Sequence, residues 1–305
     1  MGISREQALD CFASDDLIGI GMEADAVRRQ LHPEGVVSYL VDGTVDVAEM
    51  AAETASFDTI YTRIGTIVEA GGTGIRLAGT SSSQFTMERL EGLLAAIKDR
   101  FTSLWVQGFS AGEILALANR AGISVADTIQ RLQTAGLDSI PGTPDVEGWA
   151  DVHRTAHRLG MKTSAAMIFG AGETMEQRVA QLEAIRQLQA ETGGFTSFVP
   201  YTFQPSGAQR AGGLEEATAV EYLKTLAIAR MYLDNIENVQ ASVETQGLKV
   251  VQMGLRFGGN DVGSALSGAA GYTSGATEEE LRRIIRDAGF KPAQRDPLYR
   301  MMFLN

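Results

Sequence analysis

Two carboxylates and one arginine are the side chains on which acid–base chemistry in this sequence would depend. If the protein is an enzyme, we expect Glu173 or Glu244 to transfer protons and Arg76 to bind an anionic group. Arg76 stands within the apolar run Gly74–Gly79, where an uncompensated buried guanidinium would cost several kcal/mol. Unless Arg76 faces outward, it must therefore meet either a protein carboxylate, for which Glu244 and Asp138 are candidates, or a ligand carboxylate or phosphate.

Lysine and histidine are poorly placed for catalysis. Lys162 lies at the start of a predicted strand, whereas a Schiff-base lysine must lie inside the barrel. His153 and His157 are four residues apart and could form one edge of a zinc site, but no third ligand is evident. We expect this pair to be solvated or capped on an outer helix, and we predict no metal site.

The sequence contains one cysteine, Cys11. A single thiol excludes an internal disulfide, and it excludes a thiolate cage for zinc or an iron–sulfur cluster because such cages need about four cysteines. No base or cation flanks Cys11 to stabilise a thiolate, so we expect a small, partly buried helix residue.

Charge and hydropathy limit the expected partners and location. A formal net charge of −12 without a basic cluster opposes binding to nucleic acid or to an anionic membrane surface. The N-terminal residues lack the apolar region of a signal peptide, and no run approaches the ~20 apolar residues of a membrane span. We therefore expect a soluble cytoplasmic protein.

Alternating β-rich runs and amphipathic segments indicate the fold that positions these side chains. Residues 1–34 are expected to form a helical extension that begins with a capping box at Ser4 and Gln7. Residues 35–305 are expected to form an α/β fold, a single (β/α)8 TIM-type barrel with a C-terminal helical tail. The predicted strands are Val36–Val41, Ile75–Gly79, Leu104–Phe109, Leu137–Ile140, Thr163–Phe169, Phe195–Phe203, Val239–Ser242 and Asn260–Val262. The clearest predicted helices are Glu173–Gln189, Ala217–Leu233 and Glu278–Ala288, and Ser264–Thr277 is predicted to be a flexible loop.

In such a barrel the active site lies at the carboxyl ends of the strands. The polar residues expected there are Asp42, Thr80 to Ser83, Ser110, Glu113, Thr143, Gly170 to Glu173, Thr202, Gln204, Ser242, Glu244, Asn260 and Asp261. Each of them could instead serve as a helix cap or a loop hydrogen bond.

Six stretches carry a resemblance to a known family. They are 32–42 (HPEGVVSYLVD), 109–114 (FSAGEI), 138–142 (DSIPG), 169–174 (FGAGET), 200–205 (PYTFQP) and 255–264 (LRFGGNDVGS). Together they resemble cyclic dehypoxanthine futalosine synthase, the radical SAM enzyme of the futalosine route to menaquinone, which is akin to aminofutalosine synthase and the deazaflavin-forming synthases. In that family, three cysteines after the first strand hold a four-iron cluster that cleaves S-adenosylmethionine to a 5′-deoxyadenosyl radical.

Three loops depart from the family pattern. The segment 42–54 after the first strand is shorter and has no cysteine, so we expect no iron–sulfur cluster and no reductive cleavage of S-adenosylmethionine. The turn after the second strand has become Gly79 to Ser83, with Ala78 where a glutamine is expected. The glycine-rich loop after the fourth strand is reduced to Gly142 to Asp145.

The resemblance implies a site for an adenosine-like or futalosine-like nucleoside, with S-adenosylmethionine or a related nucleoside as the ligand. The residues that match the family's nucleoside-contacting part are Ser110, Glu113, Gly170, Gly172, Thr202, Gln204, Asn260 and Asp261. Two alternatives stay open, namely an enzyme of altered, non-radical acid–base chemistry and an engineered scaffold without the cluster loop. A homo-oligomer or an association with another enzyme of the pathway is compatible with this sequence.

Overall fold

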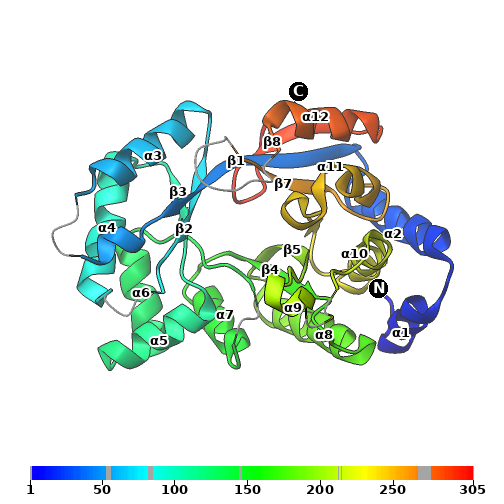
Figure 1. The fold of residues 1–305 in the computed structure, drawn as a ribbon, viewed down its shortest axis with the longest axis horizontal. Coiled ribbons are helices and arrows are strands. Elements are labelled where there is room, and N and C mark those ends of the chain that lie inside the picture. Colours follow the sequence, from blue (N-terminus) through cyan, green and yellow to red (C-terminus); the bar gives the residue numbers. More distant parts are fainter. Residues whose placement is uncertain are drawn as a thin grey trace.

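The computed structural model describes residues 2–52, 56–81, 85–143, 146–211, 213, 215–266 and 276–304 (Figure 1). The predicted N-terminal extension forms two helices, α1 (Arg5–Ala13) and α2 (Leu17–Leu31), and the predicted capping box at Ser4 and Gln7 is confirmed. Both helices pack against α10. The extension therefore covers the outside of the fold and does not form part of its interior.

Within the residues that the structure describes, six strands form the larger sheet. They are β1 (Val36–Asp46), β2 (Gly74–Ala78), β3 (Trp105–Gln107), β7 (Asp261–Leu266), β8 (Lys291–Arg295) and β9 (Met301–Leu304). The strand order is β3–β2–β1–β8–β9, and β7 also pairs with β1. All of these pairs are parallel except β8–β9, which is antiparallel.

The smaller sheet contains β4 (Thr163–Phe169), β5 (Phe195–Thr202) and β6 (Asn238–Val239), which are all parallel. An isolated parallel bridge joins Gln240, which follows β6, to Asp261 of β7 in the larger sheet, and another joins Gln107 of β3 to Ser139. The structure is thus an α/β fold with a half-barrel sheet, and a strict (β/α)8 barrel is not confirmed.

The predicted strand Leu137–Ile140 is wrong, because within it only Ser139 makes a bridge. The Asp138 carboxylate accepts a hydrogen bond from the backbone N–H of Val106 at 2.7 Å. At this point of the pairing with β3, the acceptor is therefore a side chain and not a backbone carbonyl. Pro141 follows and has no N–H with which to extend the pairing.

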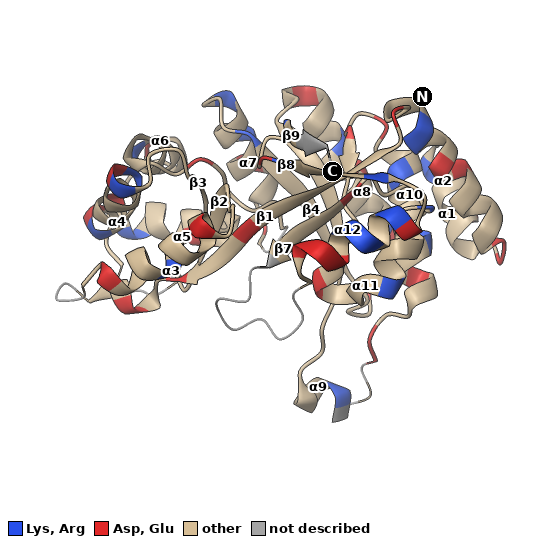
Figure 2. Ribbon diagram, turned by 90° about the horizontal axis from the view of Figure 1, so that it is seen from above, with Lys and Arg blue, Asp and Glu red and all other residues tan. Residues whose placement is uncertain are grey.

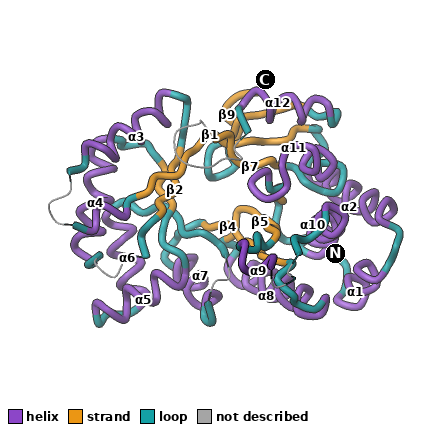
Figure 3. Tube along the Cα trace, viewed as in Figure 1, coloured by secondary structure: helices purple, strands orange, loops and turns teal. Residues whose placement is uncertain are grey.

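Helices surround the strands (Figure 3). They are α3 (Asp58–Glu69), α4 (Met87–Arg100), α5 (Ala111–Ala121), α6 (Val125–Ala135), α7 (Trp149–Arg158), α8 (Met175–Thr192), α9 (Gly207–Ala211), α10 (Ala219–Tyr232), α11 (Val243–Gly254) and α12 (Glu278–Asp287), with a 3-10 helix η1 (Ala48–Ala51) after β1. The predictions for α8, α10 and α12 are confirmed to within a few residues. Two hydrophobic clusters, one containing Ile64 and Leu94 and the other Leu182 and Leu226, lie where helices pack on strands.

Two strands extend beyond their predicted ends. β1 continues through Asp42 to Asp46, because Gly43 allows the Ile67 side chain of α3 to approach: a Cβ at Gly43 would lie 2.5 Å from Ile67 Cδ1. β7 runs from Asp261 to Leu266, so the prediction of Asn260–Val262 was wrong in extent. Asn260 and Asp261 therefore lie at the amino end of β7 rather than at its carboxyl end.

The C-terminal segment also differs from its prediction. The helix α12 is present, but it is followed by the hairpin β8–β9 rather than by a helical tail. The run Lys291–Arg295 contains a proline and little apolar alternation, so it carries no ordinary strand pattern. Parts of other predicted loops, namely Ser82, Ser83, Pro144, Asp145 and 267–275 of the Ser264–Thr277 loop, lie outside the described residues.

The surface of the helices carries charges of both signs. Figure 2 shows acidic and basic residues interspersed on α4 and α12. In the part of the chain that the structure describes, no helix is both long and apolar enough to span a membrane.

Candidate ligand site in the barrel interior

A cavity of about 120 Å³ lies between the two sheets. Its walls come from alternate residues of the strands, such as Trp105 and Gln107 of β3 and Val199 and Tyr201 of β5, because every second strand residue faces inward. The interior of an ordinary TIM barrel is filled by branched apolar side chains. Here most of the lining side chains are polar, which favours a binding cavity over a packed core.

Arg76 is the centre of charge in this cavity. Its Nη1 donates a hydrogen bond to Glu244 Oε1 at 2.7 Å, and its Nε lies 3.6 Å from Asp42 Oδ2. Burial alone would lower the pKa of Arg76, but the carboxylates of Asp42 and Glu244 outweigh burial and raise it. Glu244 was a predicted partner and is confirmed, whereas the other candidate, Asp138, pairs with Lys98 at 2.5 Å.

The guanidinium of Arg76 is incompletely satisfied. Its Nε is buried and has no hydrogen-bond partner among the described residues. Asp42, by contrast, accepts a hydrogen bond from Ser264 Oγ as well as facing Arg76. One guanidinium and two carboxylates thus form a cluster with a net charge of −1 that retains a free donor.

Thr202 and Gln204 lie at the carboxyl end of β5, as predicted. Thr202 Oγ1 accepts hydrogen bonds from Gln204 Nε2 at 3.0 Å and from Gln246 Nε2 at 2.8 Å. Gln246 and Glu244 both lie in the first turn of α11. This first turn ends at Gly247, whose φ of 70° is not helical. This turn therefore links β2 through Arg76 to β5 through Thr202.

Glu173 does not line the cavity. Its carboxylate accepts hydrogen bonds from the N–H of Gly170 at 2.8 Å and of Ala171 at 2.9 Å, and it pairs with Arg178 at 2.5 Å. Burial alone would raise the pKa of Glu173, but the Gly170 N–H and the Arg178 guanidinium lower it. The carboxylate fixes the turn in which Gly170 and Gly172 adopt φ of 89° and 100°.

Ser110 and Glu113 form a helix cap. Ser110 is the N-cap of α5, and Glu113 Oε2 accepts the N–H of Ser110 at 2.7 Å while Oε1 accepts the Thr80 hydroxyl at 2.6 Å. They border a separate hollow of about 270 Å³ between α4 and α5, and neither lines the interior cavity.

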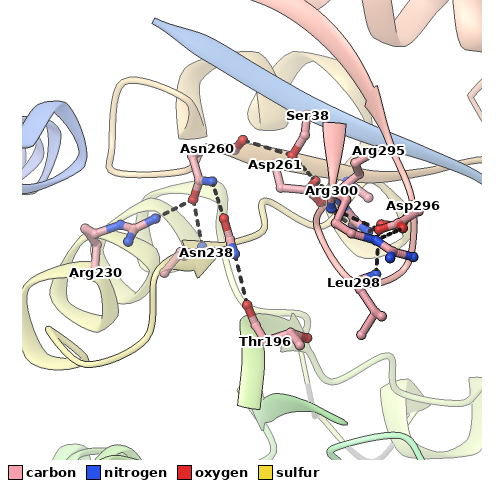
Figure 4. Close-up of polar contacts among 12 residues, drawn as sticks. Ser38, Thr196, Arg230, Asn238, Asn260, Asp261, Arg295, Asp296, Leu298 and Arg300 are labelled. Carbon is pink, nitrogen blue, oxygen red and sulfur yellow. Dashed lines mark hydrogen bonds and ion pairs between the residues drawn. The ribbon is translucent and has the colours of Figure 1, made fainter. Parts of the chain in front are cut away.

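Asn260 and Asp261 belong to a buried polar network (Figure 4). Asn260 Oδ1 accepts hydrogen bonds from Arg230 Nη2 at 2.5 Å and from the N–H of Val239 at 2.8 Å. Asp261 is fully buried, and it pairs with Arg295 Nε at 2.5 Å and Nη2 at 3.0 Å. This network holds β7 to β6 and to the C-terminal hairpin, and the structure does not bring either residue into the Arg76 cluster.

His153 lies in the core, and His157 is half-buried beside it. His153 is fully buried on α7, its Nδ1 is 3.1 Å from Thr163 Oγ1, and His157 Nε2 is 2.8 Å from the same oxygen. The expectation was a solvated or capped pair, and the solvated alternative is therefore wrong for His153. Burial, with a smaller contribution from His157, lowers the pKa of His153 to about 3.

This burial predicts a pH dependence of stability. An unfolded His153 takes up a proton below its ordinary pKa of 6.5, whereas the folded protein resists protonation until about pH 3. The free energy of unfolding should therefore fall as the pH falls through that window, by roughly 2 kcal/mol at pH 5. Urea unfolding at pH 7 and pH 5 should show this loss in the wild type and a smaller loss in His153→Phe, which keeps the ring contacts with Trp149 and Phe195. An equal loss in both proteins would contradict this assignment.

The position of the one cysteine bears on metal ligation. Cys11 lies on α1 against the hydrophobic core, and burial together with Glu23 and Asp10 raises the pKa of its thiol. The segment after β1 supplies η1 and no cysteine. Among the described residues, no three His, Cys, Asp or Glu side chains are grouped so as to hold a metal ion. The residues present therefore do not fit an iron–sulfur cluster.

Several residues of this site were not among the predicted site residues. Ser264 and Tyr201 line the cavity, as do Gln107 and Gln240, and the tip of the C-terminal hairpin (Pro297 to Tyr299) closes it. Inward alternation could have indicated Gln107 and Tyr201, but the hairpin brings residues from the end of the chain that no local pattern places there.

The fold and its polar interior define a TIM-like α/β protein with a polar interior cavity. The crystal structure of methylornithine synthase (PylB) has a similar fold, with a TM-score of 0.71 over 96% of this chain and 95% of that chain. At 14% sequence identity this similarity concerns the fold alone.

Sequence relatives give the family. Cyclic dehypoxanthine futalosine synthase of Streptomyces coelicolor is 32% identical, covering 97% of this chain and 85% of that protein. Aminodeoxyfutalosine synthase of Thermus thermophilus is 36% identical over 68% of this chain and 63% of its own length. The family profile "CofH/MqnC C-terminal region" matches residues 192–304. The chain therefore belongs to the cyclic dehypoxanthine futalosine synthase family of the radical SAM superfamily, as a member with a single cysteine.

The alignment also bears on the trimmed loops. The match to the Streptomyces protein runs over 339 positions, which exceeds the 305 residues of this chain. The relative thus has segments that this chain lacks.

Proposed function

We propose that this protein is a cluster-free member of its family that binds an adenosine-like or futalosine-like nucleoside without reductive cleavage of S-adenosylmethionine. The single observation that carries the proposal is the cysteine content: Cys11 is the one thiol of the chain, and it lies on α1. A four-iron cluster needs several thiolates, which one cysteine cannot supply.

The polar interior supports retained ligand binding. A polar cavity in the interior lacks the hydrophobic packing that stabilises an ordinary barrel. The presence of such a cavity despite this loss of stability favours a role in ligand binding. Asp42 and Glu244 line the cavity and can accept hydrogen bonds from ribose hydroxyls, and the Arg76 guanidinium lies beside them. We place the sugar of the ligand at this cluster.

A second candidate is an enzyme of altered acid–base chemistry. It is supported by Glu244, which meets Arg76 in the same cavity as the Tyr201 hydroxyl. Glu173 is a weaker choice for a general acid, because its lowered pKa is the reverse of what that role requires.

Ligand binding is tested by thermal shift. S-adenosylmethionine, 5′-deoxyadenosine and dehypoxanthine futalosine should be titrated separately, and at least one should raise the melting temperature in a saturable way. Incubation with the same ligand should leave it chemically unchanged. The absence of a shift with all three would remove the binding proposal, and turnover would favour the acid–base candidate.

A further inference from the structure

Three uncharged polar side chains of the interior have unused hydrogen-bonding capacity. Gln107 of β3, Ser164 of β4 and Gln240, which follows β6, all line the cavity and are half-buried. No side-chain hydrogen bond of theirs is found among the described residues. Because each carboxamide presents an N–H donor beside a C=O acceptor, the two glutamines match a partner with the same paired groups.

The size of the cavity limits what can enter it. A cavity of about 150 Å³ accommodates benzene, and the volume of this cavity is about 120 Å³. Sites for drug-sized ligands have roughly 300–1,000 Å³. One ring therefore fits within this volume, and the rest of a nucleoside would extend toward Arg76 and Glu244, whose side chains are 27% and 34% exposed.

The walls favour a flat, uncharged ring. Trp105 of β3 and Tyr201 of β5 both line the cavity and offer aromatic surface. Charges at the ends of the cavity already have partners: Arg295 pairs with Asp261, Lys162 Nζ donates to the carbonyl of Gly193 at 2.8 Å, and Arg76 pairs with Glu244. Gln107 pairs in register with Arg76, and the net charge of −1 on the cluster of Arg76, Asp42 and Glu244 disfavours an anionic ring.

We propose that the space lined by Gln107, Ser164 and Gln240 is a subsite for one uncharged planar heterocycle that carries N–H donors and carbonyl acceptors, as a nucleobase does. The remainder of the ligand then lies at the Arg76 cluster. This inference rests on the proposed nucleoside binding for the nature of the ligand, but the subsite can be tested separately with ring-sized probes.

The test uses uracil as the probe, at millimolar concentration, in ligand-observed NMR with the full chain. Benzene, which has a similar size and no hydrogen-bonding groups, is the second probe. Uracil is expected to bind more tightly than benzene, and Gln107→Leu and Gln240→Leu should each weaken uracil binding at least tenfold. Gln187→Leu, which changes an exposed glutamine on α8, should leave it unchanged. The melting temperature of each variant establishes that it is folded, and if one of them is unfolded, the other decides.

Two results would overturn the subsite. One is benzene binding as tightly as uracil, and the other is uracil binding that both leucine variants retain. If uracil fails to bind while a whole nucleoside still gives a saturable thermal shift, the subsite is wrong and the proposed function stands. If neither uracil nor any nucleoside binds, both fail.

Discussion

Replacing Asp261 by alanine is expected to lower the free energy of unfolding by about 3–5 kcal/mol, because it leaves the buried Arg295 guanidinium without its counter-charge. Arg295 is almost fully buried, and Asp261 is its ion-pair partner at 2.5 Å. The same carboxylate also accepts the Ser38 hydroxyl at 2.5 Å and the N–H of Gly263 at 2.8 Å, so three elements lose an acceptor together. Denaturant unfolding followed by circular dichroism measures the change.

Two further variants separate this explanation from a general loss of charge. Glu216→Ala removes the surface partner of Arg210 and should cost less than about 1 kcal/mol. The double variant Asp261→Ala with Arg295→Met should be more stable than Asp261→Ala alone, since no buried charge is then unpaired. If Asp261→Ala were as stable as the wild type, the structural role of Asp261 would be contradicted and its predicted role in ligand binding would regain weight.

Replacing Arg76 by methionine is expected to weaken nucleoside binding by roughly 10- to 150-fold. The estimate follows from the roughly 1.5–3 kcal/mol of a hydrogen bond to a charged group. Methionine retains part of the side-chain volume but removes the guanidinium that lines the cavity and pairs with Asp42 and Glu244. Isothermal titration with the ligand that gives the thermal shift measures the change.

The matched control is Arg131→Met on α6, which removes a surface guanidinium paired with Glu91 at 2.7 Å. It lies outside the interior cavity, so the affinity should be unchanged. An Arg76→Met protein that is folded and binds with wild-type affinity would show that the Arg76 cluster is not part of the ligand site.

The sequence was most informative where local pattern and tertiary context agree. The strand Thr163–Phe169 and the helix α12 were predicted almost to the residue, because an apolar run and a strongly amphipathic segment each have one reasonable structure. Arg76 was recognised as a residue needing a partner, and its pairing with Glu244 follows from the cost of burying an isolated charge.

The remaining features depend on contacts between distant segments. Asp42 and Gly43 have the composition of a turn, yet β1 continues through them because Arg76 compensates Asp42 and the Ile67 side chain packs on Gly43. Asp261 was predicted to bind a ligand at the end of a strand. In the structure it pairs with Arg295, which comes from a hairpin that has no strand pattern in the sequence. The predicted ligand roles of Ser110, Glu113, Gly170 and Gly172 stay predictions, and in the structure these residues form a helix cap and a fixed turn.

We propose that this member of a radical SAM family holds no four-iron cluster. Anaerobic reconstitution is the decisive test of this proposal. Purified full-length protein is incubated with iron, sulfide and a thiol reductant, desalted, and assayed for bound iron and for 5′-deoxyadenosine formed from S-adenosylmethionine with dithionite. We predict iron and sulfide at background level, no charge-transfer absorption and no 5′-deoxyadenosine, because Cys11 alone cannot ligate the cluster. About four irons and four sulfides per chain, with reductive formation of 5′-deoxyadenosine, would contradict the account.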